Sequence, residues 1–224
     1  MTDSSMKTMI KNCKNKHYCI VCSLLITLAG LCLAATSCSS DDDVQVPNYI
    51  VELVEIDTNK DTLVTVIRTD NGTTYNVTQT IVATVPDTTY RCLCSYAFTD
   101  KQLTIYSLSV IFSEIPMKAE LFKVRPTDPV KFVSCWKSGR YLNLQIGIKT
   151  TDADYHKYAF SEDSIVTKGT SKTVFFTLLH QRPVDDDESY TKDTYLSIPI
   201  SSYTDCDSFA ISVNTYEGLR QVIR

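Results

Sequence analysis

The stretch YLNLQIGIK, residues 141–149, decides the fold of this 224-residue chain. Large aliphatic side chains stand at every second position from Leu142 to Ile148, with polar or small residues between them. Because the side chains of a strand alternate between the two faces of a sheet, this period of two predicts a strand with one face committed to a core. No segment after residue 37 keeps helical periodicity over three turns with caps. The sequence therefore predicts an all-β protein.

Further strands are expected on both sides of this stretch. In the C-terminal half they are 130–136, 141–149, 156–160, 173–180, 194–200 and 209–214, separated by turn clusters at roughly even spacing. Short strands with this spacing are typical of an antiparallel β-sandwich, which we expect to occupy residues 130–224.

A smaller set of strands precedes the sandwich, at 49–56, 62–69, 73–78, 89–98 and 102–112. The turn Asp70-Asn71-Gly72 predicts a tight hairpin between the second and the third of them. In the fifth strand the apolar positions shift by one residue, which would move the apolar set to the other face, so we expect a bulge near Ile105. Five strands in a bulged, bent sheet suit a small β-barrel, placed at residues 48–123.

Residues 124–129, VRPTDP, are interpreted as a linker between the two modules. Pro126 and Pro129 have no backbone N–H and disfavour regular strand pairing, which leaves an extended connector. We expect each module to have its own core and to fold separately.

Residues 1–37 have the order of a secretory signal peptide. Four lysines come first, an apolar run from Ile20 to Leu33 follows, and small residues end the segment. Cys38 then stands where the first mature residue is expected, which resembles a bacterial lipoprotein site whose thiol is acylated. A transmembrane anchor is an alternative, but the run is shorter than the roughly 20 residues of a span. A plain cleaved signal is another alternative and would leave Cys38 without a role.

An acidic tether is expected at residues 38–47. Its first residues resemble the tag that sends lipoproteins of Bacteroides-type bacteria to the outer face of the outer membrane: Ser39, Ser40, Asp41, Asp42 and Asp43. An ordinary solvated tether is the alternative, because acidic runs repel one another and stay extended. The tag predicts an outer-membrane lipoprotein that faces the cell exterior.

The charge of the mature chain restricts its partners. Without residues 1–37 it keeps 18 basic and 25 acidic side chains, a net charge of about −7. This balance argues against nucleic acid, which demands a basic patch, and against electrostatic docking on anionic lipid. We therefore expect the acyl chains on Cys38 to provide the attachment to the membrane.

Four cysteines follow Cys38 in the sequence: Cys92, Cys94, Cys135 and Cys206. In an exported chain they allow three full disulfide pairings. Cys92 and Cys94 share one face of a predicted strand, roughly 6.5–7 Å apart and at the limit for a bridge. A chain of this size buries enough apolar surface without disulfides, so we favour reduced, buried cysteines. The spacing of Cys92 and Cys94 is also wrong for zinc.

Motifs of the second module resemble a known family. They are DPV (128–130), CWKSGRYLNL (135–144), LLHQ (178–181), YLSIPI (195–200) and VNTYEG (213–218). Together they resemble the NigD-like lipoproteins of Bacteroides-type bacteria. The resemblance implies an OB-like N-terminal barrel, a C-terminal β-sandwich and an immunity-like role in protection against bacteriocins or other antagonists. It supplies no catalytic residues.

The sequence contains none of the common catalytic motifs: no nucleophile elbow, no glycine-rich phosphate loop and no metalloprotease helix signature. The most polar constellation is His180 followed by the acidic residues 185–188. Consecutive carboxylates behind Pro183 lack the alternate spacing and the glycine of a calcium loop, so a solvated hairpin tip is favoured over a metal or ligand site. We therefore expect no enzyme activity, no cofactor and no metal.

Trp136 and Tyr141 flank a predicted hairpin tip that contains Arg140. Aromatic side chains near a loop can anchor a protein partner or stack on a sugar, so Trp136, Arg140 and Tyr141 are the predicted partner-binding residues. The loop 185–188 is a second candidate, and a core position is the alternative for Trp136.

Three classes of function remain open: a module that binds a protein or peptide, a glycan-binding accessory lipoprotein, and a hydrolase with an unrecognised site. An exposed aromatic platform favours the second class, a flat apolar patch the first, and a deep pocket with convergent carboxylates the third.

Overall fold

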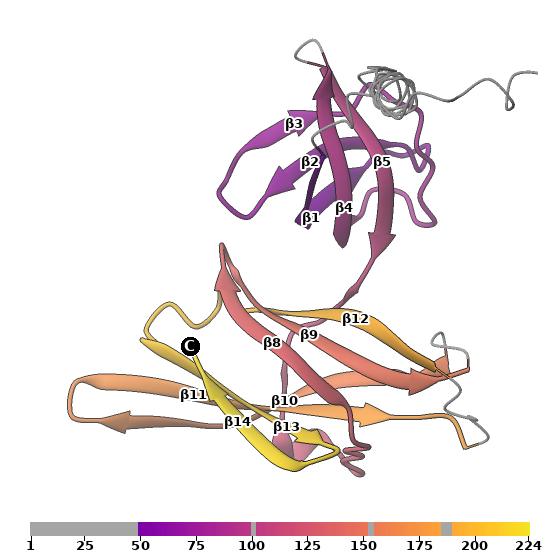
Figure 1. Cartoon of the computed structure of the whole chain (residues 1–224). Coiled ribbons are helices and arrows are strands. Elements are labelled where there is room, and N and C mark those ends of the chain that lie inside the picture. The colour runs from indigo at the N-terminus through magenta and orange to yellow at the C-terminus, as the bar shows by residue number, and fades with distance from the viewer. Residues whose placement is uncertain (1–48, 100–101, 152–154, 185–189) are drawn as a thin grey trace, which may run out of the picture. The chain divides into compact units, whose positions relative to one another are not determined.

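The computed structural model describes residues 49–99, 102–151, 155–184 and 190–224, which belong to one compact unit, Pro47–Arg224 (Figure 1). Their secondary structure consists of fourteen strands and one short 3-10 helix, Ala119–Leu121. None of these residues forms a helix long and apolar enough to span a bilayer. The predictions for the signal peptide 1–37, Cys38, the tag from Ser39 to Asp43, the tether up to residue 47 and the loop 185–188 concern residues outside those described.

The first module is one curled antiparallel sheet (Figure 1). In sheet order its strands are β3 (Thr74–Asn76), β2 (Val64–Thr69), β1 (Ile50–Thr58), β4 (Thr89–Thr99) and β5 (Gln102–Val110). Alternate side chains fill a core of their own, which includes Ile56, Ile67 and Cys94. The predicted hairpin turn at residues 70–72 joins β2 to β3, and Gly72 there has a φ of 90°.

A bulge bends this sheet, and the side chain of Gln79 bridges its open side. Between β4 and β5 the register shifts, so that Ser95 pairs with Ser107 but Tyr96 pairs with Ile105, which confirms the bulge predicted near Ile105. On the open side, the Gln79 amide takes the place of a strand. Its Oε1 accepts from the backbone N–H of Ile105 at 2.6 Å, and its Nε2 donates to the Ile105 carbonyl at 3.3 Å. The predicted small OB-like barrel is confirmed as this curled sheet.

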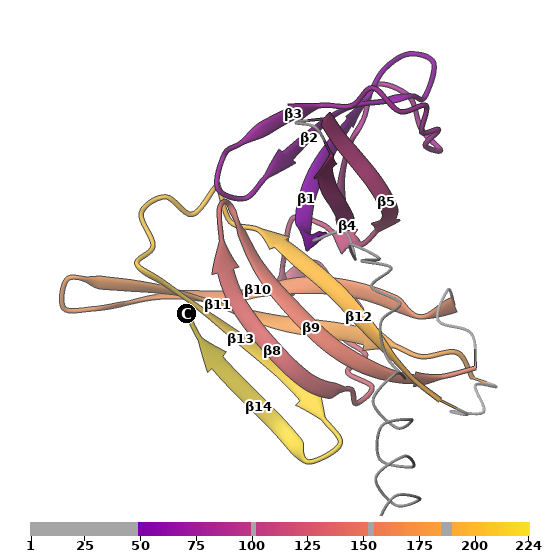
Figure 2. The same cartoon turned by 45° about the horizontal axis from the view of Figure 1, so that its top comes forward.

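The second module is a sandwich of two sheets (Figure 2). One sheet has the order β6 (Phe112–Ser113), β12 (Tyr190–Pro199), β9 (Tyr141–Thr150) and β8 (Lys131–Ser138). The other has the order β14 (Gly218–Ile223), β13 (Ser208–Thr215), β11 (Ser171–Gln181), β10 (Lys157–Lys168) and β7 (Met117–Lys118). Leu142, Leu144, Ile146 and Ile148 on β9 are fully buried in the core between the sheets, as their alternation predicts. The other face of β9 carries Asn143, which is also buried.

The sandwich differs from the sequence prediction in three details. Its sheets are mixed, because β7 pairs with β10, β6 with β12 and β11 with β13 in parallel. Strand β10 runs to Lys168, well beyond the predicted end at residue 160, and forms a long hairpin with β11. The last strand, β14, was not predicted, because Arg220 and Gln221 interrupt the apolar pattern there.

The segment predicted as a linker, 124–129, is hydrogen-bonded to the sandwich. The carbonyl of Pro126 accepts from His180 N–H, and Asp128 N–H donates to the His180 carbonyl, both at 2.9 Å. The prolines permit this because the N–H in the pairing comes from Asp128, while Pro126 contributes only its carbonyl. Ahead of it, β6 and β7 already belong to the sandwich sheets. The division into modules 48–123 and 130–224 stays a proposal.

Candidate functional site

Glu55 on β1 is the centre of the contact between the barrel and the sandwich. It is 3% exposed. Arg140 donates from Nε and Nη2 at 2.7 and 2.5 Å, the hydroxyl of Tyr141 donates at 2.6 Å, and Nη1 of Arg68 donates at 2.7 Å. Burial alone would raise the pKa of Glu55, but the hydrogen bonds from these three residues outweigh it and lower the pKa to about 2. Glu55 is therefore a fixed negative charge, fully satisfied by its neighbours.

A second buried ion pair lies next to Glu55. The guanidinium of Arg91 on β4 is bidentate to Asp70, with bonds of 2.6 and 2.7 Å, and Arg91 is 4% exposed. The same guanidinium donates to Asn143 of β9 at 3.2 Å and lies 4.0 Å from the centre of the Tyr141 ring. Planar bidentate pairs of this kind fix orientation as well as distance. They hold the barrel against the sandwich in a defined register.

Gly139 is required where the β8–β9 hairpin approaches the barrel. It has a φ of 53°, which favours glycine, and a Cβ at this position would lie 2.7 Å from the Asp70 carbonyl oxygen. The hairpin tip predicted at residues 137–140 is confirmed, since β8 ends at Ser138 and β9 begins at Tyr141. Its tip is seated on the turn between β2 and β3.

Two of the three predicted partner-binding residues thus have a role inside the protein. Tyr141 is 8% exposed and bonded to Glu55, and Arg140 is paired with the same carboxylate although much of its side chain is exposed. Trp136 on β8 is half-buried. The structure brings Arg140 and Tyr141 together on Glu55, a residue that sequence reasoning did not single out. Binding of a partner by Trp136 and the exposed part of Arg140 stays a prediction.

The two histidines after residue 38 lie together in the sandwich. Nδ1 of His180 bonds to the carbonyl of Asp128 at 2.9 Å, so this nitrogen carries a proton. Its Nε2 then accepts from Nδ1 of His156 at 2.8 Å in the neutral pair, and the ring of Tyr158 stacks on His180. Burial lowers the pKa of His180, with the neighbouring His156 adding to this effect. The two imidazoles are buried and hydrogen-bonded to each other, so they form a core cluster.

The described residues are expected from the sequence to hold neither a metal nor a reactive thiol. No group of three or more His, Cys, Asp or Glu side chains in those ranges could hold a metal ion. The four cysteines are free thiols, and three of them, Cys92, Cys94 and Cys135, are buried as expected, whereas Cys206 is half-buried. Burial raises the pKa of Cys92 to about 12 and that of Cys94 to about 11, which leaves them unreactive.

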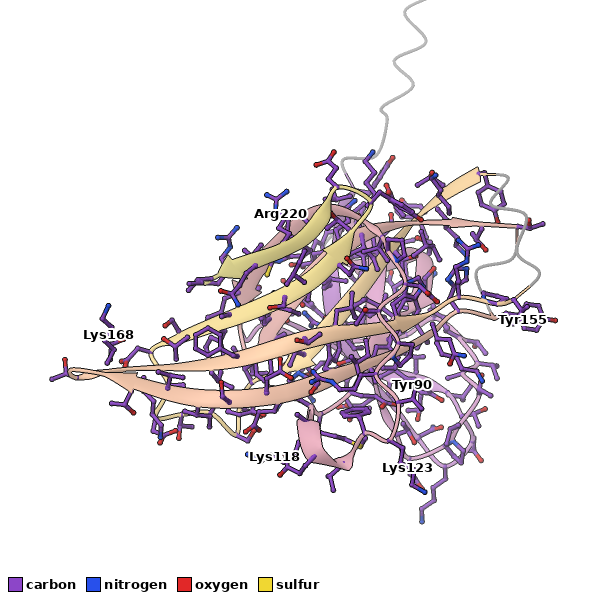
Figure 3. All side chains as sticks on the ribbon, turned by 90° about the horizontal axis from the view of Figure 1, so that it is seen from below. Tyr90, Lys118, Lys123, Tyr155, Lys168 and Arg220 are labelled. Carbon is purple, nitrogen blue, oxygen red and sulfur yellow. The ribbon has the colours of Figure 1, made fainter. Side chains whose placement is uncertain are left out.

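A groove of about 740 Å³ lies at one corner of the sandwich. We call it the basic groove. Its charged lining consists of Lys131, Lys149 and Arg220 with a single carboxylate, Glu217. The guanidinium of Arg220 lies 4.3 Å above the centre of the Phe132 ring, and the Lys149 ammonium lies 4.6 Å from that of Tyr216. Figure 3 places Arg220 on β14 and Lys168 at the tip of the β10–β11 hairpin.

Sequence reasoning missed the basic groove because its lining comes from β8, β9, β12 and the β13–β14 hairpin. The sequence carries a single signal for the groove: the cation Arg220 lies in a segment that also contains the apolar residues Leu219 and Ile223. The groove lies beside two sheet edges, since β8 and β14 are each the outermost strand of their sheets. A surface that combines cations, aromatic rings and strand edges can bind an anionic ligand.

The fold and these sites define a two-module, all-β protein: a small curled barrel joined through a buried ionic contact to a β-sandwich. Residues 114–223 match the family model described as the NigD-like C-terminal beta sandwich domain. This part of the chain is therefore a NigD-like C-terminal beta sandwich domain, which confirms the resemblance noted in its sequence motifs.

Solved structures with a similar fold come from Bacteroides and Parabacteroides species. A NigD-like immunity protein from Bacteroides caccae is 24% identical, with a TM-score of 0.61, over 80% of this chain and 92% of its own. A candidate lipoprotein from Bacteroides fragilis is 13% identical, with a TM-score of 0.57, over 80% of this chain and 97% of its own. A candidate toxin-related protein from Parabacteroides distasonis is 13% identical, with a TM-score of 0.58, over 79% and 92%. No curated protein matches the sequence.

Proposed function

We propose that this protein is a lipid-anchored, non-enzymatic interaction module of the bacterial outer membrane, facing the cell exterior, and that its basic groove binds an anionic surface of a protein partner. In this proposal Cys38 carries the acyl chains, and Ser39 to Asp43 direct display on the cell surface. An immunity-like role fits within it, because protection against an antagonist requires binding to a protein. One neighbour in fold is described as a NigD-like immunity protein.

The observation that carries the proposal is the charge of the basic groove. The whole chain has a formal net charge of −4, yet three cationic side chains face one carboxylate in this hollow. Opposite charge on a partner would steer its approach and select it over neutral surfaces. The aromatic rings of Phe132 and Tyr216 add apolar contact area beside the cations.

The groove supports the two other classes of function less well. A sugar ring stacks on a bare aromatic face, but a cation already lies over a face of Phe132 and of Tyr216. A hydrolase needs an acid and a base that converge on one point, whereas the groove contains the single carboxylate Glu217. A partner that supplies carboxylates of its own complements this lining.

The test uses the full chain, purified in detergent, and polyaspartate as an anionic polypeptide probe. We expect the double variant Lys131→Glu, Arg220→Glu to lose roughly ten-fold or more in affinity, because two attractive pairs become repulsive. The control is Lys123→Glu, Lys168→Glu, which makes the same change in net charge on exposed residues outside the groove. Binding that falls equally in both double variants would contradict the assignment to the groove, since only net charge would then matter.

A further inference from the structure

Strand β14 presents a free edge, and its hydrogen-bond pattern tells which backbone groups face outward. Phe209 and Arg224 exchange both backbone N–H···O bonds, at 2.7 and 2.9 Å. In an antiparallel ladder such pairs recur at every second position, so Val222 and Arg220 also direct their backbone groups toward β13. The residues between them direct theirs away from the sheet.

Leu219, Gln221 and Ile223 are these outward residues. The carbonyl of Ile223 accepts from Nη1 of Arg224 at 2.9 Å. The outward N–H and C=O groups of Leu219 and Gln221 have no hydrogen-bond partner within the described ranges. This part of the edge is therefore open to a further strand.

The edge of β8, on the other side of the groove, is less available. Nε of Arg224 donates to the carbonyl of Cys135 at 2.8 Å, which occupies a backbone acceptor in the middle of that strand. An added strand would therefore find open partners at Leu219 and Gln221 along β14, and a ladder interrupted in the middle of the strand along β8.

The side chains of β14 divide between two different surfaces. Val222 is buried in the core, so Arg220, two residues earlier, faces the same way and reaches over Phe132 in the basic groove. Leu219 and Ile223 lie on the opposite face of the sheet, where they are 74% and 54% exposed. A strand beside β14 would alternate in the same way, with every second side chain near Arg220 and Lys131 and the others beside Leu219 and Ile223.

We propose that the partner contributes an extended segment that adds to this sheet as a strand along β14, with acidic side chains over Lys131 and Arg220 and apolar side chains over Leu219 and Ile223. The inference rests on the proposed function and deepens it, because it names the partner class as an acidic, strand-forming segment of a protein. Backbone pairing to Leu219 and Gln221 supplies affinity, and the alternation of acidic and apolar side chains supplies specificity. A polysaccharide offers no such ladder of N–H and C=O groups.

The probe is a synthetic eight-residue peptide in which aspartate alternates with valine, tested on the full chain in detergent. We expect it to bind, and we expect the same peptide with N-methylated valine amides to bind roughly ten-fold or more weakly, because each lost backbone hydrogen bond weakens the complex. On the protein side, Gln221→Pro should have the same effect, since it removes an outward N–H and no backbone bond to β13. The side-chain bond from Gln221 Nε2 to the hydroxyl of Ser212 on β13 is lost in Gln221→Ala as well. Gln221→Ala is the matched control and should bind as the wild type does.

The outcomes separate this inference from the proposed function. Equal binding of the normal and the N-methylated peptide would overturn strand addition, while loss of polyaspartate binding in the Lys131→Glu, Arg220→Glu variant would still support the groove. Binding of a uronic-acid polysaccharide in preference to both peptides would overturn the protein partner itself. If Gln221→Pro lowers the melting temperature markedly, this variant no longer tests strand addition. The comparison of the normal and the N-methylated peptide on the wild-type chain then serves as the test.

Discussion

At the scale of single residues, the buried charges of the junction are held by hydrogen-bond geometry. Glu55 receives four hydrogen bonds from three side chains, and Arg91 is enclosed by Asp70, Asn143 and Tyr141. Buried charges of this kind are costly when one partner is missing, although an intact pair contributes little net stability. Substitutions here therefore test how strongly the barrel is fixed to the sandwich.

The first prediction concerns the pH dependence of Glu55. Its pKa is lowered from 4.5 to about 2 in the folded protein, so its contribution is complete above pH 4.5 and is lost as the pH falls toward 2. We expect Glu55→Gln to reduce the free energy of unfolding by at most about 3 kcal/mol at pH 7. The difference from the wild type should shrink toward zero near pH 2 in urea titrations. Glu114→Gln, an exposed control, should show no difference at either pH, and a constant loss for Glu55→Gln would contradict the charge argument.

The second prediction concerns Gly139. Gly139→Ala adds a Cβ that meets the Asp70 carbonyl, whereas Gly169→Ala, at a φ of 62°, adds one that meets nothing within 4 Å. Both variants bear the backbone strain of a positive φ, of about 1 kcal/mol, and only the first must also move the hairpin tip. We expect Gly139→Ala to lower the free energy of unfolding by at least about 1 kcal/mol more than Gly169→Ala. Equal losses would mean that the hairpin yields without cost.

At the scale of elements, the first module closes its curled sheet with a side chain. Gln79 accepts from and donates to the backbone of Ile105, as a neighbouring strand would. A two-sided amide contact of this kind satisfies buried backbone groups that the short strand β3 does not reach. The bulge after Ser95 lies at this contact, because the register shift places Ile105 opposite Tyr96.

The third prediction follows from this contact. Gln79→Ala leaves the N–H of the buried Ile105 without its acceptor, which should cost about 1–3 kcal/mol. We expect faster hydrogen exchange at the Ile105 amide and a lower denaturation midpoint. Gln102→Ala removes only an exposed bond to Thr78 and serves as the control. Unchanged exchange at Ile105 would show that the sheet does not depend on Gln79.

Much of the strand and turn structure could be predicted from the sequence, whereas the contact around Glu55 and the basic groove could not. The alternation around Leu144, the turn before Gly72 and the phase shift at Ile105 are local patterns, and each gave the right structure. The contact of Glu55 with Arg140 joins residues 85 positions apart, so it depends on how two modules meet. The basic groove likewise needs four separate segments in place. No local pattern encodes either one.

At the scale of the whole molecule, the proposed attachment to the membrane depends on Cys38, which precedes the first strand in the sequence. The fourth prediction is that Cys38→Ala abolishes membrane fractionation, because acyl chains on this thiol supply the attachment. Labelled palmitate should enter the wild type and not the variant. Equal labelling of both proteins would place the lipid elsewhere.

The fifth prediction concerns separate folding of the two modules, since their buried cores are distinct. A fragment from Ile111 onward contains β6 and β7 and should show one cooperative thermal transition. A fragment from Thr127, at the predicted linker, lacks both edge strands and should melt at a lower temperature. If neither fragment is folded, the sandwich depends on the barrel.

The placement of β6 and β7 also bears on the order in which the chain folds. These two short strands lie next to each other in the sequence, yet one pairs with β12 and the other with β10, so their partners emerge 40 to 80 residues later, roughly. Loop-closure entropy opposes contacts between residues that are distant in the sequence. We therefore expect β6 and β7 to pair only late in folding, after their partner strands have formed. The barrel, complete by Val110, has no such delay. We therefore expect a fast phase from the barrel and a slower phase from the sandwich in refolding experiments.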